Sequence, residues 1–343
     1  MHMADALLSP AVGGAMWAAA AGVMAYSARK VKRTFDDRRV PLMGVLGAFV
    51  FSAQMINFSI PGTGSSGHLG GGMILSILLG PSAAFVVMAS VLAVQALLFA
   101  DGGLLALGCN IFNLGFIPAF VAYPLVYRPL AGSAGYGTRR AIAAVLASVV
   151  ALQLGAFCVV LETTLSGVSE IPFVAFLLLM QSIHLAIGLV EGVATAGVIG
   201  FIARARPELL SQDRARAAAS RPILATLVVI AIVSGGALCW LASSRPDGLE
   251  WSIARATGKE EIAGARGSVH RWIEWAQKKV ALLPGYGFRP EAGAAQSQDD
   301  DAARGGAVGV DPGTPVSGLV GGLVVLALAA LIGWLLKPRR TAA

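Results

Sequence analysis

The sequence predicts an all-α integral membrane protein with about nine transmembrane helices, a group of seven followed by a group of two. Three observations lead to this fold class. The 343 residues are 56% hydrophobic and only 13% charged, whereas soluble domains carry about 25% charged residues. Long apolar runs recur along the chain, and Lys and Arg gather in short segments between them. A soluble enzyme is therefore excluded, because too few charges are present to cover a water-facing surface.

Each expected span is an apolar run near the roughly 20 residues that a helix needs to cross the hydrocarbon core. The expected spans are 10–28, 41–58, 69–80, 82–100, 104–127, 140–161, 172–203, 222–243 and 317–336. The third span is short and opens on the glycine run 70–72. We expect a tilted or partly broken helix there, buried in protein because lipid cannot satisfy irregular backbone.

The basic residues indicate which side of the membrane each connection faces. Outside residues 244–316 there are 17 Lys and Arg, and all lie in four segments, 29–39, 128–140, 204–221 and 337–340. Nine crossings bring these segments to one side, which the positive-inside rule assigns to the cytoplasm. We therefore expect a bacterial cytoplasmic (inner) membrane protein with its N-terminus and residues 244–316 outside and its C-terminus inside. The net charge of +7 then reports topology, so nucleic acid is not an expected partner.

The chain lacks the sequence patterns of common enzyme sites. It has no GxxxxGK(S/T) phosphate loop, no HExxH motif and no GxSxG motif. Its three cysteines, Cys109, Cys158 and Cys239, stand singly in apolar runs, so neither a disulfide framework nor a thiolate metal site is expected. The N-terminus lacks the basic region and cleavage site of a removed signal peptide, so we expect it to be retained. The sequence predicts no catalytic residues.

The second residue, His2, has the chemistry of a metal ligand. A free terminal amine, the backbone nitrogen of residue 2 and the Nδ1 atom of its imidazole can close two adjoining chelate rings around one ion. A fourth nitrogen would complete a square plane, which favours Ni(II) or Cu(II) over Zn(II). His68 is the candidate for that position and Met1 would supply the amine. The alternative is that His2 is an incidental terminal residue.

The segment from Asn57 to Gly72 is rich in glycine and hydroxyl side chains. Asn57, Ser65 and Ser66 could supply hydrogen bonds that orient an imidazole. The alternative is a plain re-entrant turn. The amides of Gln95 and Asn110 could act in the same way, or could simply join helices, as could that of Asn113.

A polar face is expected on the seventh helix. Its members are Gln181, His184, Gly188, Glu191 and Thr195. Buried ionisable residues within a membrane are candidates for function, but such pairs also join helices, so the roles of His184 and Glu191 stay open. Asp5 is expected to order the N-terminal segment, and His270 is expected to be solvated.

Two sets of motifs resemble a known family. The start Met1-His2-Met3 with Ser9-Pro10, together with the 57–72 run, closely resembles the substrate-binding membrane components of cobalt/nickel energy-coupling-factor (ECF) transporters, the CbiM/NikM family, over about residues 1–205. Residues 246–250 (PDGLE), 283–288 (LPGYGF) and 317–321 (SGLVG) resemble the auxiliary CbiN/NikN-type PDGLE domain. Members that we associate with this family start Met-His-Ile, and Met3 replaces the isoleucine without removing a nitrogen ligand.

The resemblance implies a NikMN-like fusion. Its expected domains are a seven-helix metal-binding unit at 1–205, a cytoplasmic linker at 206–221 and a two-helix auxiliary unit at 222–343. The implied metal ligands are Met1, His2 and His68. The implied partners are a coupling membrane subunit of the CbiQ/NikQ type and cytoplasmic ATPases of the CbiO/NikO type. No cofactor is implied, and Ni²⁺ or Co²⁺ is the transported ion. The alternative function is a self-sufficient divalent-cation channel or secondary carrier.

Overall fold

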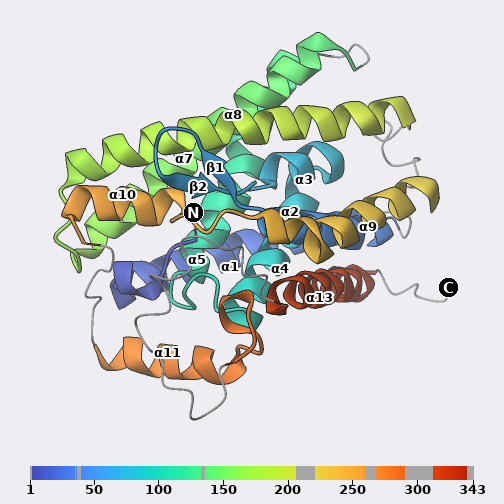
Figure 1. Ribbon diagram of the computed structural model, residues 1–343. Helices are drawn as coiled ribbons and strands as arrows, with labels where there is room; N and C mark the ends of the chain where they lie inside the picture. Colours follow the sequence, from blue (N-terminus) through green and yellow to red (C-terminus); the bar gives the residue numbers. More distant parts are fainter. Residues whose placement is uncertain are drawn as a thin grey trace.

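The computed structural model describes residues 2–34, 36, 40–132, 136–205, 221–259, 267–289 and 312–337. These residues are almost entirely helical, and long helices make up the bundle seen in Figure 1. The one sheet among them is a hairpin of β1 (Phe58–Ile60) and antiparallel β2 (Ser65–Gly67). The expected all-α membrane fold is thus confirmed.

Six helices in the described part of the chain are long and apolar enough to cross a membrane. They are α1 (Pro10–Arg33), α4 (Pro81–Leu98), the continuous α5–η3–α6 segment (Leu107–Ala131), α7 (Thr138–Ser166), α8 (Phe173–Ala205) and α13 (Gly313–Leu335). Two further apolar helices, α2 (Val40–Gln54) and α9 (Arg221–Gly236), are shorter than the sequence predicts. Together with the short α3, described below, these elements are compatible with about nine crossings.

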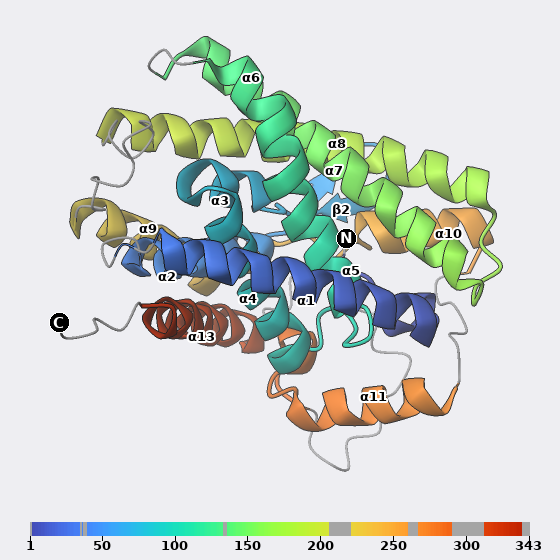
Figure 2. The ribbon, with the colours of Figure 1, turned by 180° about the vertical axis from the view of Figure 1, so that it is seen from behind.

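The N-terminal end of α1 shows why the long helices begin where they do. Ser9 caps the helix, because its Oγ accepts a hydrogen bond from the backbone N–H of Val12 at 3.3 Å. Pro10 follows at the first helical position, where no amide hydrogen is needed. In Figure 2, α1 runs across the back of the bundle beside α4 and α5.

The third expected span is a broken crossing. Its helix, α3 (Gly72–Leu79), is fully buried and only about 12 Å long at 1.5 Å per residue. Gly71 enters it with a φ of +76° and Gly80 leaves it with a φ of +82°, both in the region that favours glycine. Irregular backbone therefore completes the crossing, in a position where surrounding helices cover it. This agrees with the expectation of a buried, interrupted helix.

The fifth span combines three helical segments. The α-helix α5 (Leu107–Ile111) passes into the wider π-helix η3 (Phe112–Tyr127) and then into α6 (Arg128–Ala131). Pro118 and Pro124 lie inside η3. Proline has no amide hydrogen and displaces the preceding turn, which accounts for the departure from regular α-helical bonding.

The last two apolar helices, α9 and α13, pack against α2 (Figure 1). Gly318 of α13 lies so close to Gly235 of α9 that an added Cβ would be 2.1 Å from the Gly235 carbonyl oxygen. Gly321 meets the ring of Phe51 in α2 equally closely. Small residues allow the helix backbones to approach, which is how helices associate in a membrane.

Residues outside the apolar bundle lie mainly in two further helices. The helix α10 (Gly248–Thr257) lies beside α8 and the hairpin, and α11 (Ser268–Val280) packs against α4. Asp247 caps α10 by accepting hydrogen bonds from the N–H groups of Leu249 and Glu250 at 2.8 and 2.9 Å. Three short 3-10 helices complete the described elements: η1 (Asp5–Leu7), η5 (Leu238–Leu241) and η6 (Pro284–Tyr286).

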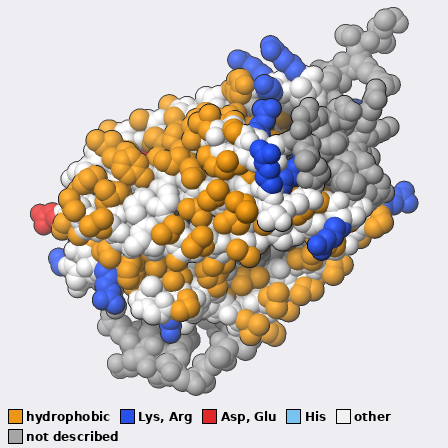
Figure 3. All heavy atoms as spheres, turned by 90° about the horizontal axis from the view of Figure 1, so that it is seen from above, with side chains coloured by type: hydrophobic (Ala, Val, Ile, Leu, Met, Phe, Trp, Pro, Cys, Tyr) orange, Lys and Arg blue, Asp and Glu red, His pale blue; other side chains and the backbone are white. Residues whose placement is uncertain are grey.

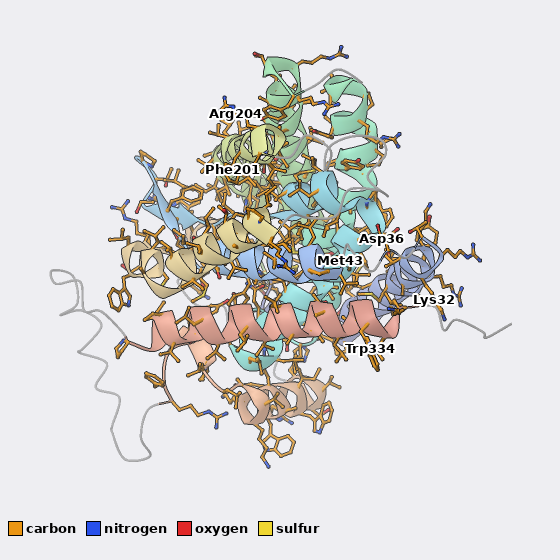
Figure 4. All side chains as sticks on the ribbon, turned by 90° about the vertical axis from the view of Figure 1, so that its right-hand side faces the viewer. Lys32, Asp36, Met43, Phe201, Arg204 and Trp334 are labelled. Carbon is orange, nitrogen blue, oxygen red and sulfur yellow. The ribbon has the colours of Figure 1, made fainter. Side chains whose placement is uncertain are left out.

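Helix ends that carry basic residues lie together at one end of the bundle. Figure 4 looks onto this end, where Lys32 of α1, Arg204 of α8 and Trp334 of α13 lie. Figure 3 shows hydrophobic side chains across the middle of one face and Lys and Arg nearer its edges. Such an apolar band is what a lipid-facing surface requires. The remaining predicted basic positions at 38–39, 206–216 and 339–340, and most of the 206–221 linker, lie outside the described residues.

Candidate metal centre

The N-terminal segment folds into the bundle. The Met3 side chain is fully buried, and Asn110 binds the Met3 backbone twice, through Oδ1 to the N–H at 2.8 Å and through Nδ2 to the carbonyl at 3.3 Å. Gly103 donates its N–H to the same carbonyl at 2.9 Å. Asp5 accepts a hydrogen bond from the Ala106 amide at 2.9 Å, so its carboxylate does order this segment, as expected.

The fold brings His2 and His68 together. Their ring centroids are 5.0 Å apart and their planes differ by 10°. The His2 side chain is only 9% exposed. Met1, the third expected ligand, lies outside the described residues. Among the residues that the structure describes, no three His, Cys, Asp or Glu side chains form a metal-binding group, but the site expected here needs only two such side chains.

The His68 ring is prepared to bind through one nitrogen. Its Nδ1 lies 3.1 Å from the backbone carbonyl of Leu69. With the Nδ1 proton donated to that carbonyl, Nε2 carries the lone pair that a metal needs. Burial also lowers the pKa of His68 to about 3, so the imidazole is neutral at physiological pH.

A buried carboxylate holds the backbone that follows His68. Glu191 of α8 is 2% exposed, and its two carboxylate oxygens accept hydrogen bonds from the N–H groups of Gly70 at 2.8 Å and Gly71 at 3.2 Å. Gln54 donates to the Gly70 carbonyl at 2.8 Å, and Gln95 donates to Gln54 at 2.8 Å. Gln95 therefore reaches the loop through Gln54, a residue that the sequence analysis did not single out.

The hydroxyl residues of the hairpin face another partner. Ser66 donates through its backbone N–H to the Pro246 carbonyl at 2.8 Å and through Oγ to the Arg245 carbonyl at 2.8 Å. Ser65 Oγ also lies within hydrogen-bonding distance of the Pro246 carbonyl, at 3.3 Å. The Asn57 carbonyl accepts from Ser243 at 2.8 Å. These hydrogen bonds join the loop to the segment before α10. The His68 Nδ1 instead lies beside the backbone carbonyl of Leu69.

A small cavity adjoins His68. It is lined by His184, Asp247, Gly248 and Ile187 among others, and its volume of about 10 Å³ is space for about one water molecule. The His184 ring is 1% exposed and its Nδ1 lies 2.8 Å from the Met180 carbonyl. Within the described part of the chain, its Nε2 has no hydrogen-bond partner. His184 thus borders the candidate site.

Asp101 is a residue of the candidate site that sequence reasoning missed. Its Oδ1 lies 3.1 Å from Nδ1 of His2, and Tyr286 donates its hydroxyl to Oδ2 at 2.5 Å. Burial acts to raise the pKa of Asp101, but the charge of His2 and the hydrogen bonds outweigh it and hold the pKa well below its usual range. The available signal was an acidic residue in the turn that follows an apolar helix, Phe99-Ala100-Asp101-Gly102.

His270 differs from expectation. It is 8% exposed, and its Nε2 lies 2.8 Å from the carbonyl of Leu8. The expected solvated histidine is therefore a buried contact between α11 and the N-terminal segment. One face of the amphipathic helix α11 is buried against the bundle. The charged residues Arg266 and Arg271, which lie near His270 in the sequence, gave no indication of this burial.

Comparisons with known proteins agree with this architecture. The family model described as cobalt uptake substrate-specific transmembrane region matches residues 2–209. The chain belongs to this family. A PDGLE domain model matches residues 221–338. The chain is therefore a member of the cobalt-uptake family that carries a PDGLE domain.

Relatives named as fused nickel transport proteins match most of this chain. A protein of Archaeoglobus fulgidus named as a fused nickel transport protein, NikMN, is 32% identical over 96% of each chain. The fused nickel transport protein NikMN of Rhodobacter capsulatus is 32% identical over 78% of this chain and 81% of its own length. A crystal structure of a truncated transition metal transporter matches with a TM-score of 0.53 and 32% identity, covering 60% of this chain and 99% of the solved chain.

Proposed function

We propose that this protein is the substrate-specific membrane component of an ECF-type importer, which captures Ni²⁺ or Co²⁺ outside the cell and passes it inward. The observation that carries the proposal is the meeting of His2 and His68 at a ring separation of 5.0 Å inside a membrane bundle. Membership of the cobalt-uptake family and the nickel-transport names of full-length relatives support the transported ion.

The proposed metal ligands are all nitrogens. The Met1 amine, the His2 backbone nitrogen and the His2 Nδ1 chelate the ion, and His68 supplies the fourth nitrogen through Nε2. Four nitrogens in a plane suit Ni(II), and the lean toward nickel over cobalt also follows from the fused relatives. Asn110 and Glu191 support this site by fixing the backbone on either side of it, at Met3 and at Gly70.

The auxiliary unit is proposed to act on the outer side of the same site. The expected division is a metal-binding unit at 1–205, a linker at 206–221 and the auxiliary unit at 222–343. The hydrogen bonds that Ser66 donates to the backbone at 245–246 support this action, because they join the PDGLE segment to the glycine-rich loop. We assign this contact to closing the loop over a captured ion.

Energy for inward movement is proposed to come from partner subunits. These are a coupling membrane subunit and two cytoplasmic ATPases, since the chain has no phosphate loop of its own. In this orientation the basic end seen in Figure 4 faces the cytoplasm and the N-terminus faces outside, in the bacterial inner membrane.

A self-sufficient channel or carrier would need a conduction path along the polar face of α8. Both carboxylate oxygens of Glu191 instead accept hydrogen bonds from the backbone of the loop after His68. Gln181 exchanges hydrogen bonds with the backbone of α7 at Gln153. These contacts favour the importer.

The test is nickel accumulation in cells that carry this protein with its partner subunits. Inactivating the ATPase subunits by substitution of their phosphate-loop lysine is expected to abolish accumulation of radioactive nickel. A matched strain with intact ATPases and His270→Gln in this chain should still accumulate nickel, because glutamine retains a donor for the Leu8 carbonyl. Undiminished accumulation without ATPase activity would show a self-sufficient carrier.

A further inference from the structure

Asp101 binds the nitrogen of His2 that the proposed chelate requires. The distance from Asp101 Oδ1 to His2 Nδ1 is 3.1 Å. Nδ1 cannot donate a proton to this carboxylate and a lone pair to a metal at the same time. The carboxylate and the ion would therefore compete for one atom, Nδ1 of His2.

The auxiliary unit holds the turn that carries Asp101. Leu283 and Gly285 donate their N–H groups to the carbonyls of Leu98 at 3.1 Å and Phe99 at 2.8 Å. The ring of Tyr286 stacks on Phe99 at 4.9 Å. Gln277 donates to the carbonyl of Gly102 at 2.8 Å. The turn at 99–102 is thus fixed by hydrogen bonds to residues 277–286.

We propose that Asp101 is a latch on His2 in the metal-free protein, and that Tyr286 of the auxiliary unit weakens this latch so that the ion can load. The proposal rests on the metal site proposed above. It gives the PDGLE unit a defined action on the metal site. This action is exerted through the side chain of Asp101, which is not itself a proposed metal ligand.

Tyr286 can set the strength of the latch because it occupies the second oxygen of the same carboxylate. A hydroxyl that donates to Oδ2 at 2.5 Å draws negative charge away from Oδ1 and fixes the plane of the carboxylate. The hydrogen bond that His2 Nδ1 donates to Oδ1 is then weaker than with an unoccupied Oδ2. Removing the hydroxyl should make Asp101 hold His2 more firmly.

The test measures Ni²⁺ association by stopped-flow with the purified full chain, at high ionic strength so that long-range attraction of the free cation is screened. Asp101→Ala is expected to accelerate association about tenfold, as for loss of a charge-assisted hydrogen bond. Tyr286→Phe keeps the stacked ring and is expected to slow association about threefold. In the Asp101→Ala background, Tyr286→Phe is expected to change nothing.

Two further variants separate the latch from a folding effect. Ser317→Ala removes the hydrogen bond from Ser317 to the Tyr286 carbonyl but leaves the hydroxyl, so association should match the unmodified protein. Asp101→Asn keeps an acceptor without the charge, and association should fall between those of the unmodified protein and Asp101→Ala. Selective nitrogen-15 labelling of histidine reports the His2 tautomer, which should lose its Nδ1 proton preference in Asp101→Ala.

Slower association or weaker binding in Asp101→Ala would overturn the latch, because the carboxylate would then support the metal-bound imidazole. An equal effect of Tyr286→Phe in both backgrounds would overturn the role of Tyr286. Failure of the metal site itself has a different signature, since nickel affinity would then be insensitive to extension of the N-terminus.

Discussion

Asn110 binds the backbone of Met3 on both sides, accepting from its N–H at 2.8 Å and donating to its carbonyl at 3.3 Å. Asn110 is 2% exposed and Met3 is fully buried. One side chain of the fifth span therefore fixes the residue that follows His2. The position of Met3 in turn restricts where the His2 imidazole lies, because a single peptide bond joins the two residues.

Asn110→Leu is expected to lower nickel affinity about tenfold, since the buried Met3 N–H loses its acceptor at a cost of about 1–3 kcal/mol. Isothermal titration of the purified protein checks this. Asn57→Ala is the matched control, because Asn57 joins Ser243 through its backbone carbonyl and should retain full affinity. Equal loss in both variants would show that general destabilisation, and not the Met3 contact, is responsible.

Glu191→Gln is expected to weaken nickel binding about tenfold. The glutamine has one acceptor oxygen where two N–H groups, of Gly70 and Gly71, now meet a carboxylate, so one donor is left unpaired or faces another donor. The measurement is again titration. Glu170→Gln removes the same charge at an exposed position and should have no effect. Normal binding in Glu191→Gln would remove Glu191 from the support of the His68 loop.

The sequence was sufficient for the parts of the structure that depend on local pattern. Apolar length located the spans, and the glycines at 70–72 predicted the interrupted third crossing, because lipid tolerates irregular backbone only where protein covers it. His2 and His68 were paired from ligand chemistry together with family resemblance. Their separation of 5.0 Å is consistent with that pairing.

The contacts that set the site's surroundings could not be predicted in this way. The pairing of Asp101 with His2 depends on how a turn after α4 meets the folded N-terminal segment, and no periodicity encodes that. Ser65 and Ser66 were expected to orient the imidazole, but hydroxyl groups bond to whichever carbonyl is near, and here these belong to Arg245 and Pro246. His270 was misplaced for the same reason, since its partner is a distant backbone carbonyl.

Gly318→Leu is expected to lower the thermal unfolding midpoint. The new side chain would meet the Gly235 backbone at a separation that no Cβ tolerates, and overpacking of this kind costs about 1–3 kcal/mol. Gly22→Leu is the control, because an added Cβ at Gly22 has no neighbouring atom within 4 Å. A fluorescence thermal-shift assay in detergent compares the two, and equal midpoints would contradict the close packing of α9 and α13.

The proposed orientation predicts opposite labelling at two ends of the bundle. Trp272→Cys in α11, where the tryptophan is 66% exposed, should react in intact cells with a membrane-impermeant maleimide. Lys32→Cys at the end of α1 should react only after the membrane is opened. Cys109 and Cys239 are buried, and Cys158, which is of intermediate exposure in α7, is replaced by alanine in both variants to keep the background low. Labelling of Lys32→Cys in intact cells would reverse the topology.

Equilibrium binding of Ni²⁺ to a variant with one residue added before Met1 tests the central claim most directly. The extension moves the amine away from His2 and breaks the fused chelate rings while leaving every side chain in place. We expect affinity to fall at least about a hundredfold, in parallel with His2→Ala and His68→Ala, because a chelating nitrogen is lost in each. Unchanged affinity in the extended protein would contradict the nitrogen site proposed for this family member.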